Sequence, residues 1–448
     1  MRDKHAGEFD CCNSSTLVIC EGGGVMKNVI LIWCSVLLVS LLLLAGTVQA
    51  AQDVVKIGLN YPETGPYAKQ GLDQRRAADL AVEEINAAGG ILGMKVQLVY
   101  RDTKSNAKVA RGNAVELFDT EGVPMIFGGS SSAVAIATGE VALQKNRLFF
   151  GTLTYSTETT GEYGHRHIFR ECYDAYAAGK VLSEHLKKNF AGRKYFYITA
   201  NYTWGWTTES VLRGFTNTKD MVAHPEVLTE LGAKDFTEAL KEAKESKATV
   251  LVLSLFGRDM EIAVRQAAEM GLKNSMQIIV PSLNDDMAQG AGPEAMEGVI
   301  GTLPWIWTVP GTYNYPKGIA FVQKFESKYQ RYPTTSGASA YVIMHQYKEA
   351  VERAKTFETK AVIKALEGHT YTGVKDPQQW RAWDHQSLQT VYAVKCKPAA
   401  EVKKSKYQQD YFTIINVMKG EEAFVDKTEW SEIRDMVSMK PELDEHKE

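Results

Sequence analysis

Residues 84–102 read EINAAGGILGMKVQLVYRD, a stretch that joins the end of a helix, a glycine turn and a strand. Apolar residues recur at helical spacing over residues 73–86, so one face of that helix is built to pack. Gly89 and Gly90 end the helix, because glycine adopts positive φ angles without a Cβ penalty. Residues 96–100 then alternate as a strand, and residues 54–60 form another strand upstream. The order predicts a right-handed βαβ unit.

The alternation of strands and helices continues along the chain in two runs, which predicts two doubly wound lobes. The elements tested below include helices over residues 107–119, 316–329 and 338–355 and strands over residues 222–228, 390–394 and 411–417. The helices after residue 316 are expected to return to the first lobe, and the last two strands to rejoin the second. The predicted boundaries are 51–173 plus 309–384 for lobe 1, 174–308 plus 385–425 for lobe 2, and 426–448 for a polar, solvated tail with a short amphipathic piece.

The N-terminus carries a segment that does not belong to the fold. Residues 29–44 are almost wholly apolar and are followed by Val48-Gln49-Ala50, which has small residues at the two positions that a signal peptidase reads. This pattern predicts a signal peptide over residues 1–50, cleaved after Ala50, and export to the periplasm. An uncleaved anchor is the alternative, since the run is near the ~18 residues that span a bilayer. Residues 1–25 precede a good start at Met26 and are interpreted as an over-extended start.

Length, charge and cysteine usage narrow the function classes. Residues 51–448 are too many for one ordinary core and comfortable for two lobes. A net charge of −3 argues against nucleic acid or an anionic membrane surface as partner. Beyond the signal segment only Cys172 and Cys396 remain, and the sequence leaves open whether they form a bridge or stay independent thiols.

Catalytic and metal motifs find little support. No G-x-G-x-x-G follows a predicted strand, and the chain has neither a G-x-S-x-G elbow nor a P-loop. His165 and His167 alternate on a predicted strand without a nearby acidic or cysteine partner, so we interpret them as surface histidines rather than metal ligands. Asp102 and Glu158 offer no general acid and base pair. We therefore expect no enzyme activity, no metal and no cofactor.

Several ordered motifs resemble one family. They are the segments 57–71 (IGLNYPETGPYAKQG), 84–102, 128–132 (GGSSS), 167–170 (HIFR) and 264–272 (VRQAAEMGL). They are similar to the leucine/isoleucine/valine-binding family of periplasmic proteins that serve ABC importers, and the match extends from about residue 55 to residue 417. The resemblance implies a type I periplasmic binding protein, an α/β fold whose two Rossmann-like lobes, joined by three crossovers, close over a small ligand.

The resemblance also carries ligand positions onto the first lobe. Ser130, Ser131 and Ser132 lie between a strand and a helix, where backbone N–H groups and hydroxyls suit a carboxylate. A plain serine N-cap is the alternative reading of spacing alone. Thr152 and Thr154 match the next loop, where the family uses a hydroxyl and backbone groups on the ligand head.

In the second lobe, the resemblance places Trp204 and Phe256 at aromatic positions of the cleft. Ser282 stands where amino-acid binders have a carboxylate that pairs with the ligand ammonium. An unpaired buried ammonium is costly. Either Asp285 or Asp286 therefore reaches into the cleft, or the ligand has no ammonium. The additional aromatic residues Tyr155, Tyr202 and Trp206 fit a flatter ligand, such as an aromatic acid, an amide or urea, and fit structural packing equally well.

The leading hypothesis is a monomeric periplasmic receptor of an ABC importer. It captures a small solute similar to a branched-chain amino acid by cleft closure and presents the closed form to membrane permease subunits. The alternative is a periplasmic sensor for an amide, urea or an aromatic acid that reports to a signalling partner.

Overall fold

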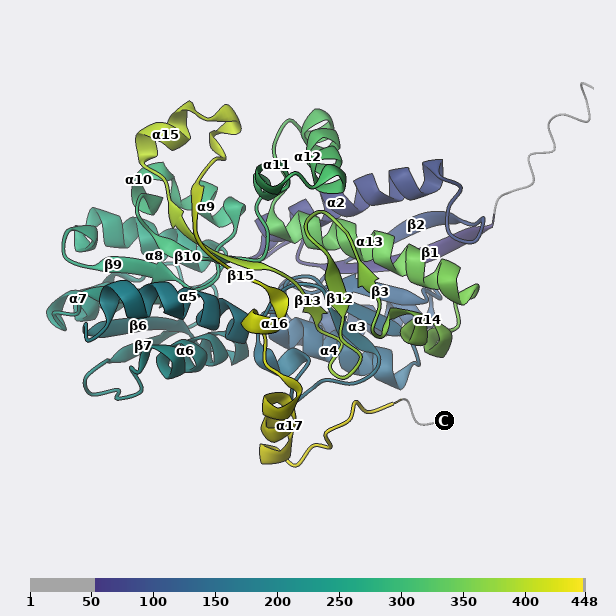
Figure 1. The fold of residues 1–448 in the computed structure, drawn as a ribbon, viewed down its shortest axis with the longest axis horizontal. Coiled ribbons are helices and arrows are strands. Elements are labelled where there is room, and N and C mark those ends of the chain that lie inside the picture. The colour runs from purple at the N-terminus through teal and green to yellow at the C-terminus, as the bar shows by residue number, and fades with distance from the viewer. Residues whose placement is uncertain (1–52, 446–448) are drawn as a thin grey trace, which may run out of the picture. The chain divides into compact units, whose positions relative to one another are not determined.

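The computed structural model describes residues 53–445 (Figure 1). The predicted signal peptide, its cleavage after Ala50 and the over-extended start lie outside these residues. Among the helices of the described part, none is long and apolar enough to cross a membrane.

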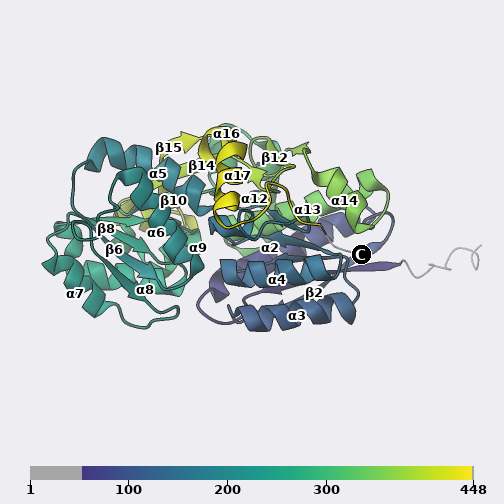
Figure 2. The same cartoon turned by 90° about the horizontal axis from the view of Figure 1, so that it is seen from below.

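The first sheet has five strands within the described residues, in the order β2-β1-β3-β4-β5, and every pairing is parallel. Its strands are β1 (Val54–Tyr61), β2 (Lys95–Asp102), β3 (Met125–Gly128), β4 (Leu148–Gly151) and β5 (Ile168–Arg170). Its helices are α2 (Ala68–Ala87), α3 (Ala107–Asp119), α4 (Ser132–Gln144), α12 (Pro316–Tyr329), α13 (Thr335–Ala354) and α14 (Thr359–Leu366). Buried residues of α3 and α4 cover one face of the sheet, whereas α2 and α13 cover the other (Figure 2).

The second sheet has seven strands in the described part, in the order β15-β14-β10-β9-β8-β6-β7. Its strands are β6 (Tyr195–Ala200), β7 (Glu226–Thr229), β8 (Val250–Ser254), β9 (Gln277–Val280), β10 (Ile300–Leu303), β14 (Val391–Cys396) and β15 (Phe412–Met418). Its helices are α5 (Ala175–Phe190), α6 (Thr203–Thr216), α7 (Thr237–Glu245), α8 (Arg258–Glu269), α9 (Asp285–Ala291), α10 (Pro293–Met296) and α15 (Ala399–Lys404). Strands β6 to β10 are parallel, and β14 and β15 extend the sheet by antiparallel pairing.

The chain passes between the two sheets three times within residues 53–445. It leaves the first sheet after β5, returns after β10 to pack α13 along α2, and rejoins the second sheet at β14. Hydrogen bonds fix the return, because the backbone N–H and hydroxyl of Thr334 donate to Asp73 of α2, at 2.8 and 2.7 Å. The predicted fold class, two doubly wound lobes with three crossovers, is confirmed. The residue boundaries assigned to the lobes stay a prediction.

Short elements lie in the second and third passages and after β15. They are α11 (Val309–Tyr313), the antiparallel strands β11 (Thr370–Tyr371), β12 (Gln378–Trp380) and β13 (Ser387–Leu388), and α16 (Gly420–Ala423). The sequence did not predict this small sheet, because strands of two or three residues are too short to show an alternating pattern.

Two sequence-based expectations about surface segments are wrong. The strand predicted over residues 222–228 begins only at Glu226, because the Asp220 carboxylate accepts the backbone N–H groups of Val222 and Ala223 and holds a turn. His165 and His167 are buried, not surface residues. Burial lowers the pKa of His165 to about 3, so its ring packs in the neutral form.

The segment after Asp426, predicted to be a solvated tail, folds against the rest of the chain. Helix α17 (Lys427–Met436) buries the side chains of Trp430 and Arg434 completely or nearly so. Both side chains reach backbone carbonyl groups of residues 160–164, which gives their polar atoms partners. The amphipathic helix therefore has a docking surface that a reading of charge alone did not reveal.

Cys172 and Cys396 are free, buried thiols, so among the described residues the reading as independent thiols holds. Burial raises the pKa of the Cys172 thiol to about 12. Neither cysteine constrains the fold covalently.

Candidate functional site

The candidate site lies where loops from the carboxyl ends of strands in both sheets touch. Tyr67, in the loop after β1, meets Tyr202, in the loop after β6, with a hydroxyl separation of 2.8 Å. The backbone N–H of Arg258, after β8, donates to the carbonyl of Pro66 at 3.1 Å. Ligands of doubly wound folds bind at this edge of the sheet. The two lobes are therefore closed over the expected ligand position.

An aromatic cluster, defined here as Tyr67, Tyr155, Tyr173, Tyr202, Trp204 and Phe256, lines this position from both lobes. Phe256 is at its centre, with ring centroids 5.6 Å from Tyr67, 5.6 Å from Tyr155 and 5.9 Å from Trp204. Trp204 is 2% exposed, and its indole Nε1 has no hydrogen-bond partner within residues 53–445. The cluster offers a buried apolar surface with an unused hydrogen-bond donor.

The serine run Ser130, Ser131 and Ser132 is buried at the N-terminus of α4. Gly128 and Gly129 before it have φ angles of 125° and 79°, and a Cβ on Gly128 would approach the carbonyl of Asn60 to 2.4 Å. Ser131 caps the helix by accepting from Val134 N at 3.3 Å, so the N-cap reading applies to this serine. Ser132 Oγ accepts from Ser156 N at 3.0 Å, and Ser130 Oγ has no partner in the described chain.

Thr152 and Thr154 lie beside the serine run but use their hydroxyls within the lobe. Thr152 Oγ1 donates to Gln74 Oε1 at 2.6 Å and approaches the carbonyl of Gly128 at 2.9 Å. Thr154 Oγ1 is 2.6 Å from Thr159 Oγ1. The structure therefore brings both threonines to the site as supports of the loop rather than as unused donors.

Two glutamines were missed by the sequence analysis. Gln70 and Gln74 occupy the buried face of α2, and Gln70 has neither amide atom hydrogen-bonded among the described residues. The Nε2 of Gln74 is likewise unpartnered there, while its Oε1 accepts from Thr152. The sequence pattern that could have revealed them is a pair of polar residues four positions apart, at the helical spacing of the buried apolar residues of α2. The predicted helix began at Asp73 and so included Gln74 but not Gln70, and the pair was not recognised.

Asp285 and Asp286, the carboxylates near Ser282, lie in different environments. Ser282 is fully buried beside Tyr173 of the aromatic cluster, whose hydroxyl also lies 3.2 Å from Thr302 Oγ1. Asp286 pairs with Arg331 at 2.7 Å, and burial raises its pKa to about 7. Asp285 has no hydrogen-bond partner for either oxygen within residues 53–445, and burial together with Asp286 raises its pKa well above the usual range.

Asp285 therefore belongs to an acidic group with Asp73, Asp286 and Arg331 rather than to the aromatic cluster. Asp259 is a carboxylate that the sequence analysis missed. It is buried next to Tyr67 and Tyr202, and burial raises its pKa to about 6, opposed by the N–H of Gly232.

Further side-chain contacts join the two lobes. Lys69 of α2 pairs with Glu261 of α8 at 2.7 Å. The hydroxyl of Thr207 in α6 donates to Glu158. Asn284 Nδ2 donates to Ser336 Oγ in α13 at 2.6 Å. These contacts can form only when the lobes are together, so they stabilise the closed arrangement.

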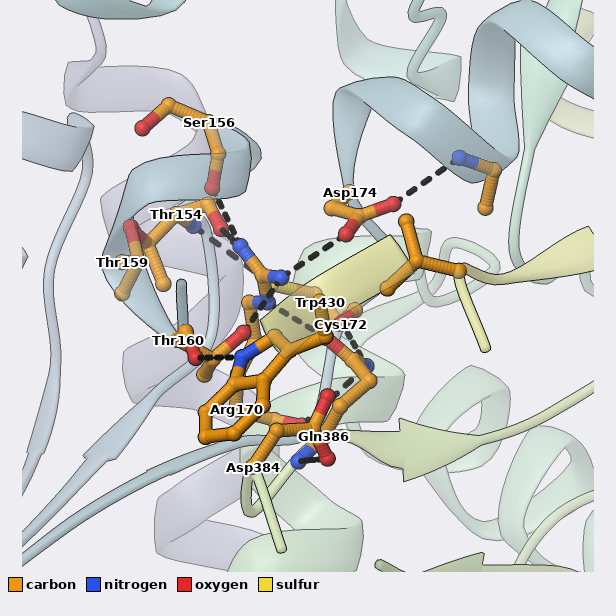
Figure 3. Close-up of polar contacts among 12 residues, drawn as sticks. Thr154, Ser156, Thr159, Thr160, Arg170, Cys172, Asp174, Asp384, Gln386 and Trp430 are labelled. Atoms are coloured by element: carbon orange, nitrogen blue, oxygen red, sulfur yellow. Dashed lines mark hydrogen bonds and ion pairs between the residues drawn. The ribbon is translucent and has the colours of Figure 1, made fainter. Parts of the chain in front are cut away.

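A buried arginine of the first lobe hydrogen-bonds to the loop that contains Thr154 and Ser156. Arg170 is 1% exposed, and Figure 3 shows its guanidinium surrounded by acceptors. The acceptors are the carbonyls of Thr154 and Ser156, the Thr160 hydroxyl at 2.7 Å, the Asp174 carboxylate at 2.9 Å and the Gln386 amide oxygen at 2.5 Å. Arg170 thus connects the loop after β4 to α5 and to the third passage of the chain.

The described residues contain no group of three or more His, Cys, Asp or Glu side chains that could hold a metal ion. The candidate site combines a buried aromatic cluster, a serine run at a helix N-terminus and polar contacts between the two lobes.

Comparison with known proteins identifies the family. A family model described as "Periplasmic binding protein" matches residues 54–404. A leucine-, isoleucine-, valine-, threonine- and alanine-binding protein of Pseudomonas aeruginosa is 26% identical over 325 residues, 72% of this chain and 84% of that protein. The crystal structure of a periplasmic binding protein from Burkholderia mallei has a TM-score of 0.77 at 25% identity, covering 84% of this chain and 98% of that one.

A further solved structure shows the fold alone. It is a solute-binding protein of an ABC transporter from Rhodopseudomonas palustris BisB5, in complex with 3,4-dihydroxybenzoic acid, with a TM-score of 0.71 at 19% identity over 82% of this chain and 98% of that one. The matched relatives are solute-binding proteins rather than enzymes, in agreement with the sequence analysis. This chain belongs to the periplasmic binding protein family, with leucine/isoleucine/valine-binding proteins among its relatives.

Proposed function

We propose that the protein is the periplasmic receptor of an ABC importer, which captures a small organic solute by lobe closure and presents the closed form to membrane permease subunits. One observation carries the proposal: the buried aromatic cluster and unpartnered polar atoms of both lobes lie near the contact between the lobes. Such a combination is typical of small-molecule sites.

The serine run is proposed to hold the anionic or carbonyl end of the solute. Ser130 has an unused hydroxyl, and Ser132 accepts one hydrogen bond and retains its own O–H proton for donation. Both lie at the positive end of a helix dipole, which favours an anion. The aromatic cluster would enclose the rest of the solute.

The body of the solute is proposed to be similar to a branched-chain amino acid, a class supported by the name of the Pseudomonas aeruginosa relative. An aromatic acid, an amide or urea is the second candidate. It is favoured by Ser282 at the position of the expected carboxylate and by the pairing of Asp286 with Arg331. Asp285 and Asp259, with raised pKa values, are the carboxyl groups that an ammonium ligand would have to ionise.

The function is tested by titrating the purified protein with L-leucine, 3,4-dihydroxybenzoate and urea in a calorimeter. We expect saturable one-site binding of at least one of them. A ligand at 100 times its dissociation constant should stabilise the fold by about 2.7 kcal/mol in a parallel unfolding experiment. Leucine binding supports the amino-acid class, and binding of only the other two supports the second candidate. No binding and no stabilisation by any of the three would contradict both ligand classes.

The two proposed roles, import and sensing, differ in the protein that the ligand-bound receptor acts on. An importer receptor is expected to stimulate ATP hydrolysis by a reconstituted permease and ATPase complex when its ligand is present. A sensor would instead change the activity of a signalling partner.

The serine run gives a further prediction. Replacing both Ser130 and Ser132 by alanine should weaken ligand binding at least roughly tenfold, because hydrogen bonds to a charged group contribute about 1.5–3 kcal/mol. Calorimetry with the ligand identified above measures the change. Ser183→Ala is the matched control, since Ser183 is also buried but bonds to the carbonyl of Lys180 in α5. Equal affinities in the double variant and the control would move the anion site elsewhere.

A further inference from the structure

Helix α17 lies beyond residue 404, where the family match ends. Its side chains Trp430 and Arg434 are 2% and 0% exposed, although the surrounding sequence is polar. Both are directed at the loop of residues 156–164, which connects β4 to β5. A helix outside the matched residues thus buries two large side chains, which contact this loop, and the Trp430 ring also packs on Trp383, with ring centroids 5.2 Å apart.

The contacts of α17 with this loop are made to backbone carbonyls. Trp430 Nε1 donates to Thr160 O at 2.9 Å, and Figure 3 shows the indole N–H directed at this oxygen. Arg434 Nη1 donates to Gly161 O at 2.6 Å and to Gly164 O at 3.1 Å.

The remaining guanidinium nitrogens of Arg434 bind the end of the described chain. Nε donates to Lys440 O at 2.6 Å and Nη2 to Glu442 O at 3.0 Å. Carbonyl groups therefore surround the guanidinium, and burial lowers its pKa. A buried cation held by carbonyl groups requires each of them to stay in place, because an arginine cannot lose its proton readily.

The other side of the same loop contacts Thr154, the serine run and the second lobe. Thr159 Oγ1 contacts Thr154 Oγ1 at 2.6 Å, and Ser156 N donates to Ser132 Oγ at 3.0 Å. Glu158 accepts from Thr207 of the other lobe, so the loop also carries a closure contact. A displacement of the loop at Thr160 would move these groups together.

We propose that Trp430 and Arg434 are positioning residues, which hold the loop of residues 156–164 so that its cleft side supports the serine run and the contact of Glu158 with Thr207. The C-terminal helix thereby sets ligand affinity and the lifetime of the closed form without touching the ligand. This inference rests on the proposed function for the existence of a ligand, whereas the restraint on the loop does not depend on the ligand.

The test compares the full-length protein with Arg434→Met, Trp430→Phe and the control Glu432→Gln, an exposed position on the same helix. Hydrogen–deuterium exchange of the ligand-free protein reports the loop, and calorimetry and stopped-flow with L-leucine and 3,4-dihydroxybenzoate report binding. We expect Arg434→Met to accelerate exchange in residues 156–164 at least tenfold. It should also weaken binding at least fivefold, mainly through faster dissociation, at a temperature where every variant remains folded.

Trp430→Phe keeps an aromatic ring and removes the N–H donor. It should therefore accelerate exchange in the loop and weaken binding, both less than Arg434→Met does. If Arg434→Met does not fold, the result with Trp430→Phe tests the proposal. Unchanged exchange in the loop overturns the proposal. Accelerated exchange with unchanged affinity and dissociation rate overturns it as well, because the helix would then be a structural support alone. If neither probe binds the unmodified protein, the proposed amino-acid and aromatic-acid ligands fail. In that case hydrogen–deuterium exchange tests the inference. The variants must then show faster exchange in residues 130–132 and 203–207 as well as in the loop of residues 156–164, and unchanged exchange in those residues overturns the proposal.

Discussion

Replacing Arg170 with methionine is expected to lower the free energy of unfolding by about 3–5 kcal/mol, the cost of removing one partner of a buried ion pair. Asp174 is 3% exposed and would lose its cationic partner. The carbonyls of Thr154 and Ser156 and the amide oxygen of Gln386 would lose a shared donor at the same time. Urea denaturation measures the loss.

The loss should grow with pH. Burial raises the pKa of Asp174, and Arg170 opposes that shift. Without Arg170 the folded variant holds a proton on Asp174 that the unfolded chain has already released, so its stability falls as the pH rises. Denaturation at pH 5 and at pH 8 should therefore show the larger deficit at pH 8.

Two further variants make this expectation specific. Arg193→Met removes an exposed arginine and should change stability by less than about 0.5 kcal/mol. Adding Asp174→Asn to Arg170→Met should recover part of the loss, because the amide removes the buried charge and can still accept from Ala177 N at the start of α5. A deficit below 1 kcal/mol that does not change with pH would show that the guanidinium is not the main support of this region.

The helices and strands that were predicted correctly are determined by residues close together in the sequence. Helices α3 and α12 begin and end at the predicted residues, because apolar periodicity and terminal residues such as the Asn106 cap act within a few positions. The family motifs likewise contain whole strand, loop and helix units, so the fold class followed from them.

The features that were missed depend on partners far along the chain. Arg170 meets Gln386 across a sequence separation of 216 residues, and Trp430 meets Thr160 across 270. A local sequence pattern gives no information about contacts between residues so far apart in the chain. The same limit explains why α17 was predicted to be solvated and why Asp285 could not be assigned to the acidic group around Arg331.

Ligand residues were predictable as positions but not as chemistry. The resemblance named Ser130, Thr152, Thr154, Trp204 and Phe256. The structure buries all five, places Thr152 against Gly128 and Gly129 before the serine run, and packs Trp204 against Phe256. The resemblance did not reveal that the threonine hydroxyls are engaged within the lobe while the Ser130 hydroxyl and the Trp204 N–H are not. That difference arises from tertiary hydrogen bonding, which decides which groups are left for a ligand.

The largest effect on binding is expected from Trp204→Ala, which should weaken ligand affinity by about 2–4 kcal/mol, roughly 30- to 1,000-fold, as a buried aromatic hot spot does. Trp204 joins the ring of Phe256 at 5.9 Å and that of Tyr202 at 6.1 Å, and its N–H has no partner in the described chain. Truncation therefore removes both apolar surface and a donor. Calorimetry with the ligand found by titration measures the change.

The same helix supplies the matched control. Trp206 lies two residues further along α6, is 51% exposed, and donates its N–H to Asn201 Oδ1 at 3.2 Å. Trp206→Ala should change affinity less than about twofold, since an exposed ring outside the cleft adds little to binding. Trp204→Phe separates the two contributions of Trp204, because phenylalanine keeps a ring but cannot donate a hydrogen bond. If Trp204→Ala and Trp206→Ala weaken binding equally, the aromatic cluster is a packing feature, and the ligand must contact a different part of the cleft.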